Sequence, residues 1–211
     1  GQGINPVHIA QTVRPITIEI LEEGNKQSLT KMGGEKRLLD IADFFIDTAE
    51  IKHHLGTKFY IWAYDFDWPF YEILAPWTSG MAQGFVIEIM IAAYKITKNE
   101  KYLETARLAA NAMAIPINTG GVAIKLSKGL WFEEYAKTNM KPPHVLNGHI
   151  FALNALWYLA ELDQQYKQLF EDGMMGLRFL LPSFDAHIWS KYDLAGTPAN
   201  RKYQRIHVYL L

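Results

Sequence analysis

Two stretches decide the fold: QGFVIEIMIAAYKITKNEKY at residues 83–102 and NGHIFALNALWYLAELDQQY at residues 147–166. Each begins with a side-chain amide residue followed by glycine, and each places a tyrosine at the same two later offsets. In each, a strongly apolar run leads through a short polar connection into a second, amphipathic segment. This pattern predicts two copies of a helical hairpin, each with a first helix that is buried on most sides.

Helical hairpins cannot bury their apolar faces alone, so repeated hairpins stack side by side. We therefore expect an all-α fold, an incomplete α/α toroid or barrel of helical hairpins with short β-hairpin excursions, forming one domain over residues 1–211. A chance likeness between two ordinary helix pairs is the alternative. The apolar periodicity predicts helices over roughly 6–22, 36–51, 79–97, 101–114, 146–161 and 164–180.

The overall composition narrows the class of protein. The 211 residues are 49% hydrophobic and carry a net charge of −1, so no global field favours nucleic acid or a membrane surface as partner. Cysteine is absent, which excludes disulfides, thiolate nucleophiles and cysteine-ligated zinc. The apolar run 85–93 contains Glu88 and is too short to span a bilayer. No signal peptide is recognisable, and the cellular location stays unknown.

Two segments break the helical pattern. Residues 58–66 (KFYIWAYDF) and 120–135 (GGVAIKLSKGLWFEEY) are rich in β-branched and aromatic residues and contain glycine turns. They predict short strands or hairpins, which we expect at one end of the helices, where loops line a cleft.

The second of these segments contains an acidic pair, Glu133-Glu134, between aromatic rings. Neighbouring residues of a strand point to opposite faces, so one carboxylate faces a cleft and the other faces solvent or a structural partner. Partial burial beside Trp131 and Tyr135 would raise the pKa of a carboxyl toward acid–base use, with the rings stacking on sugar. A solvated acidic turn is the equal alternative.

The last residues, SKYDLAGTPANRKYQRIHVYLL at 190–211, mix tyrosines with basic side chains. Tyrosine is a poor base unless nearby cations favour its phenolate, and these cations would also attract an anionic substrate. An ordinary basic surface helix explains the same composition.

The sequence gives little support for a metal site, a nucleotide-binding site or a serine nucleophile. The histidines lack metal-binding spacing, and no phosphate-binding loop, dinucleotide fingerprint or serine-nucleophile elbow occurs, so we expect neither metal nor cofactor. Gln83-Gly84 and Asn147-Gly148 begin the apolar helices. A helix N-terminus suits a carboxylate ligand, but capping and close packing at glycine explain these pairs equally well.

Several motifs taken together resemble one family. SGMAQGFVIEIMIAAYKITKNEKYLETA, WFEEYAKT, HVLNGHIFALNALWYL, YDLAG and YQRIH, in this order, are similar to the C-terminal helical domain of the D-glucuronyl C5-epimerases of heparan sulfate biosynthesis. The resemblance covers roughly residues 76–211. It implies a cofactor-independent isomerase that converts D-glucuronate to L-iduronate at carbon 5 of a uronate-containing polysaccharide or oligosaccharide. It also suggests a homodimer.

The resemblance assigns roles to residues. It implies Glu134, Tyr135, Tyr192 and Tyr203 as catalytic residues, with Glu134 and Tyr203 as the opposed acid–base pair. Asn147 matches a substrate-contacting asparagine, and Arg201, Arg205 and Trp131 complete the expected substrate-binding set.

The sequence also departs from the family pattern. Ala195 stands where the family has an arginine, which puts a sulfated substrate in doubt, and family members continue beyond the position of Leu211. The chain is therefore expected to be a shortened piece or a minimal relative. The rival functions are a polysaccharide lyase, a glycoside hydrolase using Asp193 or Asp185 as second carboxylate, and a non-catalytic carbohydrate-binding protein.

Overall fold

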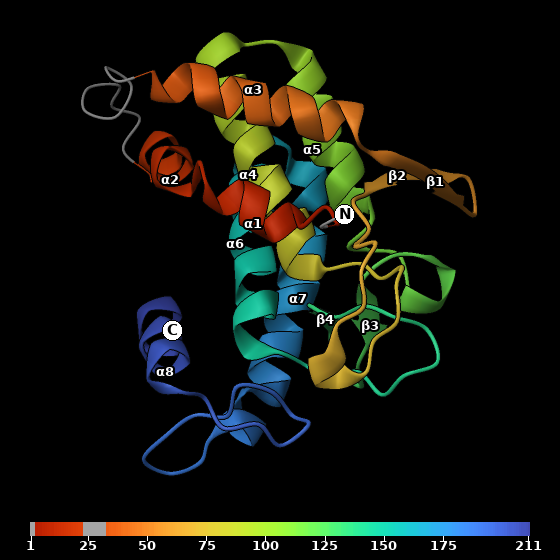
Figure 1. Ribbon diagram of the computed structural model, residues 1–211, viewed down its shortest axis with the longest axis vertical. Coiled ribbons are helices and arrows are strands. Elements are labelled where there is room, and N and C mark those ends of the chain that lie inside the picture. The colour runs from red at the N-terminus through yellow and green to blue at the C-terminus, as the bar shows by residue number, and fades with distance from the viewer. Residues whose placement is uncertain (1–2, 23–32) are drawn as a thin grey trace.

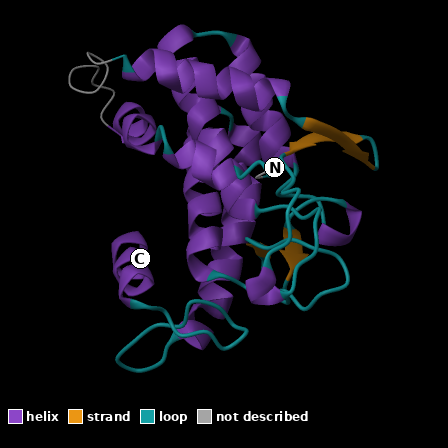
Figure 2. Cartoon of the chain, viewed as in Figure 1, coloured by secondary structure: helices purple, strands orange, loops and turns teal. Residues whose placement is uncertain are grey.

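The computed structural model describes residues 3–22 and 33–211. Within these ranges the chain is helix-rich and carries two small antiparallel hairpins, as predicted (Figure 2). The helices are α1 (Pro6–Gln11), α2 (Arg14–Glu22), α3 (Gly34–Asp47), α4 (Gly80–Thr97), α5 (Glu100–Asn111), α6 (Leu146–Leu162), α7 (Lys167–Leu180) and α8 (Arg201–Leu210). The strands are β1 (Glu50–His54), β2 (Thr57–Ile61), β3 (Ala123–Lys125) and β4 (Leu130–Phe132).

The centre of the molecule is the pair α4 and α6, which pack along each other (Figure 1). Both helices are apolar nearly all round, and most of their residues are buried. Gly84 permits the close approach, because a Cβ there would lie 3.0 Å from both the Ala152 Cα and the Phe151 carbonyl oxygen. The helices α5 and α7 pack back on α4 and α6, respectively. Both predicted helical hairpins are thus confirmed.

Two predicted helix boundaries are wrong. The expected helix over 6–22 is interrupted after Gln11, because Pro15 has no N–H to continue the hydrogen-bond ladder and disfavours helical geometry before it. The expected helix over 36–51 ends at Asp47, and Glu50 instead pairs with Ile61 across the β1–β2 hairpin. The hairpin predicted within 120–135 is confirmed as β3–β4, with Ala123 opposite Phe132.

Loops gather around the start of α4 and α6, at the same end of the helix pair (Figure 2). The Gly80 N–H at the start of α4 donates to the Glu133 carbonyl at 2.7 Å. The Leu146 N–H at the start of α6 donates to the Tyr192 carbonyl at 3.1 Å. These bonds attach the segments that carry the predicted catalytic residues to the rigid centre of the fold.

Candidate active site

The two neighbouring glutamates are both buried, which excludes the solvated acidic turn. They follow β4 directly and serve different purposes. Glu133 accepts hydrogen bonds from the backbone N–H groups of His144 at 2.9 Å and Tyr135 at 3.3 Å, so its carboxylate has structural partners. Glu134 instead lines a cavity. One carboxylate faces the protein and the other a cleft, as adjacent residues of extended chain require.

The Glu134 carboxyl is a strongly perturbed group. Burial raises the pKa of Glu134 to about 8, and the negative charge of Glu133 adds to the shift. Its Oε2 has no hydrogen-bond partner among the described residues. Gly148 makes room for it, since a Cβ at that position would lie 2.3 Å from Oε2. A carboxyl that gains and loses a proton near neutral pH is suited to proton transfer.

The cavity beside Glu134 has a volume of about 320 Å³. Tyr135 and Tyr203 line it as well, so three of the four residues predicted to be catalytic meet in one place although they lie far apart in sequence. The lining also includes Asn5, Val7, Gln11, Tyr64, Phe66, Trp68, Trp77, Ser79, Met81 and Lys202.

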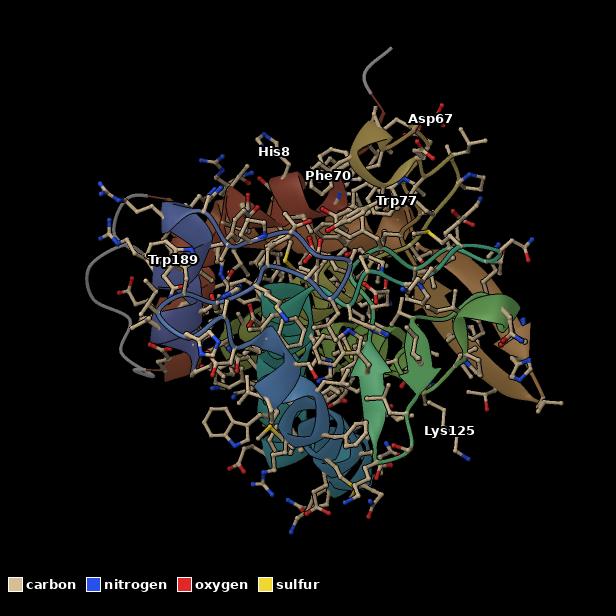
Figure 3. The ribbon with its side chains drawn as sticks, turned by 90° about the horizontal axis from the view of Figure 1, so that it is seen from below. His8, Asp67, Phe70, Trp77, Lys125 and Trp189 are labelled. Carbon is tan, nitrogen blue, oxygen red and sulfur yellow. The ribbon has the colours of Figure 1, made fainter. Side chains whose placement is uncertain are left out.

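An aromatic wall of this cavity comes from the loop between β2 and α4, which the sequence did not assign to the site. Trp77 stacks on Tyr64 with ring centroids 3.8 Å apart, and Trp68 stacks on Tyr135 at 6.0 Å. Figure 3 labels Trp77 and Phe70, which both belong to this loop. The indole N–H of Trp68 has no hydrogen-bond partner among the described residues. The aromatic density of the stretch YDFDWPF was the available signal.

The expectation that basic neighbours lower the pKa of Tyr203 is wrong. Burial raises the pKa of Tyr203, and the charge of Glu134 raises it further, while a hydrogen bond with Tyr192 acts in the opposite direction. The ammonium of Lys202 lies 5.8 Å from the centre of the Tyr203 ring without reversing the shift. Tyr203 is therefore a protonated phenol near neutral pH, suited to donate a proton rather than to accept one.

Tyr192, the fourth predicted catalytic residue, belongs to the same tyrosine cluster. Its ring centroid lies 4.4 Å from that of Tyr203. Burial raises the pKa of Tyr192 and of Tyr135, and the charge of Glu134 adds to both shifts. The buried phenols thus stay neutral and can hydrogen-bond an anion formed beside them.

Tyr71 is a further member of the cluster that sequence reasoning missed. Its hydroxyl donates to the Asp193 Oδ2 at 2.5 Å, and its ring meets that of Tyr135 edge-on at 4.9 Å. The fully buried Asp193 also accepts the N–H groups of Gly196 and Thr197 on its other oxygen. Asp193 therefore ties the loop that carries Tyr192 to the aromatic wall.

Asn147 lies at the start of α6 beside the cavity-lining Met81. Its amide nitrogen makes only a weak contact with the Met81 sulfur at 3.9 Å, and its amide oxygen has no partner among the described residues. Most of the hydrogen-bonding capacity of this buried amide is thus unused within the described structure, as a substrate-contacting side chain requires.

None of the four residues predicted to bind substrate is part of the cavity lining, Asn147 included. Trp131 is fully buried and stacked on His149 at 4.0 Å, so its predicted substrate contact is wrong: the ring belongs to the core. Arg205 is exposed and lines a different cavity, next to Arg14. Arg201 is exposed at the start of α8 and is absent from the lining of the Glu134 cavity. Lys202, which was not predicted, is the cation at this site.

Within residues 3–22 and 33–211, no group of three or more histidine, aspartate or glutamate side chains is arranged to hold a metal ion. In the same ranges, no helix has the length and apolar character needed to cross a membrane.

Comparisons with known proteins show the family to which the chain belongs. Residues 56–211 match the family described as D-glucuronyl C5-epimerase C-terminus. A D-glucuronyl C5-epimerase of Caenorhabditis elegans is 34% identical over 161 residues, which is 66% of this chain and 26% of the worm enzyme. An uncharacterized protein of Methanocaldococcus jannaschii is 31% identical over 222 residues, covering 98% of this chain and 70% of that protein. The chain therefore spans about a quarter of the worm enzyme and most of the archaeal protein, and it belongs to the D-glucuronyl C5-epimerase family.

Proposed function

We propose that this chain is a uronate C5-epimerase that inverts carbon 5 of glucuronate, giving iduronate, within a polysaccharide or oligosaccharide. The observation that carries the proposal is a single cavity lined by one group that can accept a proton and one that can donate a proton. Glu134 is a carboxyl with a pKa of about 8, and Tyr203 is a phenol that burial keeps protonated. Membership of the family supports the same reaction.

The chemistry requires a base on one side of the sugar ring and an acid on the other. The proton on carbon 5 lies next to the uronate carboxylate, so its removal places negative charge on an enolate-like intermediate. Reprotonation from the opposite side inverts the centre, and no other bond changes. Proton transfer by two positioned groups, with the developing charge held by hydrogen bonds, is an established way to lower such a barrier.

The protonation states assign a role to each group. Glu134 can be a carboxylate close to neutral pH and takes the proton from carbon 5. Tyr203, with its raised pKa, returns a proton to the other face. Tyr135 and Tyr192 donate hydrogen bonds to the intermediate, since burial keeps both phenols neutral. In the reverse direction the two roles exchange.

Substrate binding relies on the remaining groups of the cavity. Trp68 and Trp77 supply flat apolar surface of the kind on which sugar rings stack, and the free indole N–H of Trp68 can donate to a sugar oxygen. Asn147, which contacts the cavity-lining Met81 but is not itself part of the lining, has an unpaired amide oxygen that we propose for a sugar hydroxyl. Lys202 lies where it can attract the uronate carboxylate, in place of the family arginine that Ala195 replaces.

The geometry favours epimerisation over hydrolysis. An inverting hydrolase needs a second free carboxylate across the cleft. Asp193 is engaged by Tyr71, Gly196 and Thr197, and Asp185 is exposed and accepts the His187 N–H. A lyase shares the first proton transfer and differs only in expelling the substituent at carbon 4.

The proposal also includes the toroid architecture and the type of polysaccharide. The stacked hairpins α4–α5 and α6–α7 are consistent with part of an α/α toroid, whose inner helices would be α4 and α6. An unsulfated chain of the heparosan type, the precursor of heparan sulfate, is the substrate we propose, because Lys202 is the single cation among the described residues of the cavity lining.

The test is to incubate heparosan with the protein in deuterated water and follow the polymer by NMR. Deuterium at carbon 5, new iduronate signals and an unchanged chain length are the expected result. New unsaturated ends would assign a lyase, and new reducing ends a hydrolase. Binding of heparosan without exchange at any pH from 6 to 10 would contradict catalysis and leave a carbohydrate-binding protein.

A further inference from the structure

A second, larger cavity lies next to the active site, with a volume of about 580 Å³. It is lined by residues of α2, α4, α6 and α8, and Arg205 contributes to it. This is the cavity to which the structure assigns one of the arginines expected to bind substrate. None of the predicted catalytic residues lines this second cavity, so its ligand has to be inferred from its own lining.

A buried ion pair lines this cavity. Arg14 donates to one oxygen of Glu88, whose side chain is only 1% exposed. The guanidinium is fixed between two rings, 4.3 Å from the centre of Phe85 and 4.9 Å from that of Phe151. The other Glu88 oxygen has no partner among the described residues. A desolvated acceptor of this kind is costly unless it is satisfied, so the cavity is suited to a ligand that donates a hydrogen bond.

The two cavities are lined by neighbouring segments of the chain. On one side, Gln11 at the end of α1 lines the Glu134 cavity, and Arg14 at the start of α2 lines the second one. On the other side, Tyr203 lines the first cavity, and Arg205 and Tyr209 line the second. The rise of an α-helix places Tyr209 roughly 9 Å along α8 from Tyr203. This separation exceeds one sugar ring. In Figure 1, α8 lies beside α6 and below α2.

The lining chemistry restricts the ligand. The free Glu88 oxygen requires a donor, whereas Arg205, which forms no ion pair among the described residues, is suited to an acceptor of negative character. Phe151 and Tyr158 add ring surface, and Asn154 adds an amide. Hydroxyl groups, a carboxylate and a ring-sized apolar face occur together on a sugar acid.

We propose that this second cavity is a subsite for another uronate residue of the same polysaccharide chain, which runs from Glu134 along α8. The inference rests on the proposed function, because it takes its substrate class from it. It gives Arg205 a role outside the reacting sugar, as an anchor for the carboxylate of another uronate. The subsite would make the protein prefer long chains to short ones.

The experiment measures binding by calorimetry and carbon 5 exchange separately, using a heparosan disaccharide, which has a single uronate, and a heparosan octasaccharide. Arg205→Ala should weaken binding of the octasaccharide about tenfold, the loss of roughly one charge-assisted contact, and leave the disaccharide unaffected. Arg205→Glu should weaken it further, and Arg205→Lys should stay close to the unmodified protein because it keeps the charge. Arg178→Ala is the matched control, since Arg178 is an exposed arginine on α7 that lines neither cavity.

Equal affinity of the unmodified protein for both lengths, or unchanged octasaccharide affinity in Arg205→Glu, would overturn the inference. Failure of the proposed function looks different. In that case the octasaccharide binds in an Arg205-dependent way, but no deuterium enters carbon 5. If neither oligosaccharide binds, the subsite assignment is wrong.

Discussion

The two central helices begin with similar residue pairs and use them differently. At the start of α4, the Gln83 amide donates to the carbonyl oxygens of Tyr60 at 2.8 Å and Ala109 at 3.1 Å, which ties β2 and α5 to the helix. Gly84, next to it, lets the backbone of α6 approach. Both residues of this pair serve packing.

At the start of α6, the corresponding pair serves the candidate site. The Asn147 amide oxygen is unpaired among the described residues, and Gly148 makes room for the Glu134 carboxyl rather than for another helix. The comparison teaches that one local pattern in a repeated hairpin can be structural in one copy and functional in the other. What separates the two copies is the amide nitrogen, which donates to two backbone carbonyls in Gln83 and makes only a weak contact in Asn147. The amide oxygen is unpaired in both residues among the described residues.

The largest effect on the exchange rate should come from substitution of Glu134, whose carboxyl lies beside the start of α6. Glu134→Gln removes the base and should lower the rate of carbon 5 exchange roughly 10²–10⁴-fold, the usual contribution of a general base. Tyr203→Phe should lower it by a similar factor, because it removes the acid. Circular dichroism should show an unchanged helical fold in both variants. Normal turnover in either variant would mean that the acid–base pair is misassigned.

The paired glycines allow the comparison to be tested directly. Gly148→Ala would place a Cβ 2.3 Å from the Glu134 Oε2, so the carboxyl has to move. Since misplacement of a catalytic group by about 1 Å can cost about 10²-fold in rate, exchange should fall by that order. Thermal stability should fall as well, because the new Cβ would also lie 2.6 Å from the Glu134 Cβ, so the exchange rate has to be expressed per folded molecule.

Gly84→Ala is the matched control. It should lower the stability of the protein without lowering the rate of carbon 5 exchange per folded molecule. The new Cβ would lie 3.0 Å from the backbone of α6, so the two central helices must separate slightly. Overpacking of this kind costs about 1–3 kcal/mol of unfolding free energy. The rate per folded molecule should stay close to that of the unmodified protein. If Gly84→Ala impairs exchange more than Gly148→Ala does, the assignment of the two ends is wrong.

The pH dependence of exchange tests the state of Glu134 itself. The pKa of Glu134 is raised to about 8, and the active form of a base is the ionised one. In the direction in which Glu134 removes the proton, kcat/KM should therefore rise about tenfold per pH unit below pH 8 and level off above it. Deuterium incorporation measured from pH 6 to pH 9 gives this profile. A rate already independent of pH at pH 6 would indicate a base with an ordinary carboxyl pKa.

The sequence predicted the hairpins well because their signal is local. The apolar periodicity of 83–102 and 147–166 requires buried helices wherever they pack, and both helical hairpins are confirmed. The helix over 6–22 failed since a single proline outweighs periodicity at Pro15. The β1 strand was missed because its exposed, polar residues gain their order from pairing with β2, which no local pattern reveals.

The candidate site was predicted only in part, since it depends on contacts between distant segments. Glu134, Tyr135 and Tyr203 came from motifs that match the family, and they do line one cavity. Trp131 has the same aromatic character as Trp68 and Trp77, but only the fold determines which ring enters the core and which faces the cavity. The pKa of Tyr203 was misjudged because composition counts nearby cations and cannot measure burial.

The smallest effects are expected from substitution of the two amide residues that precede the glycines, Asn147 and Gln83. Asn147→Ala should remove one hydrogen bond to the substrate, worth about 1 kcal/mol, and so raise KM about fivefold with little change in Tm, because its only protein contact is the weak one to Met81. Gln83→Ala should leave KM unchanged and lower the unfolding free energy by about 1–3 kcal/mol, because two buried hydrogen bonds are lost. Steady-state kinetics and thermal melts on the same preparations measure both. A shift of KM in Gln83→Ala, or a large loss of Tm in Asn147→Ala, would show that the amides do not divide structure and function between them, and that unpaired polar atoms are a poor guide to the site.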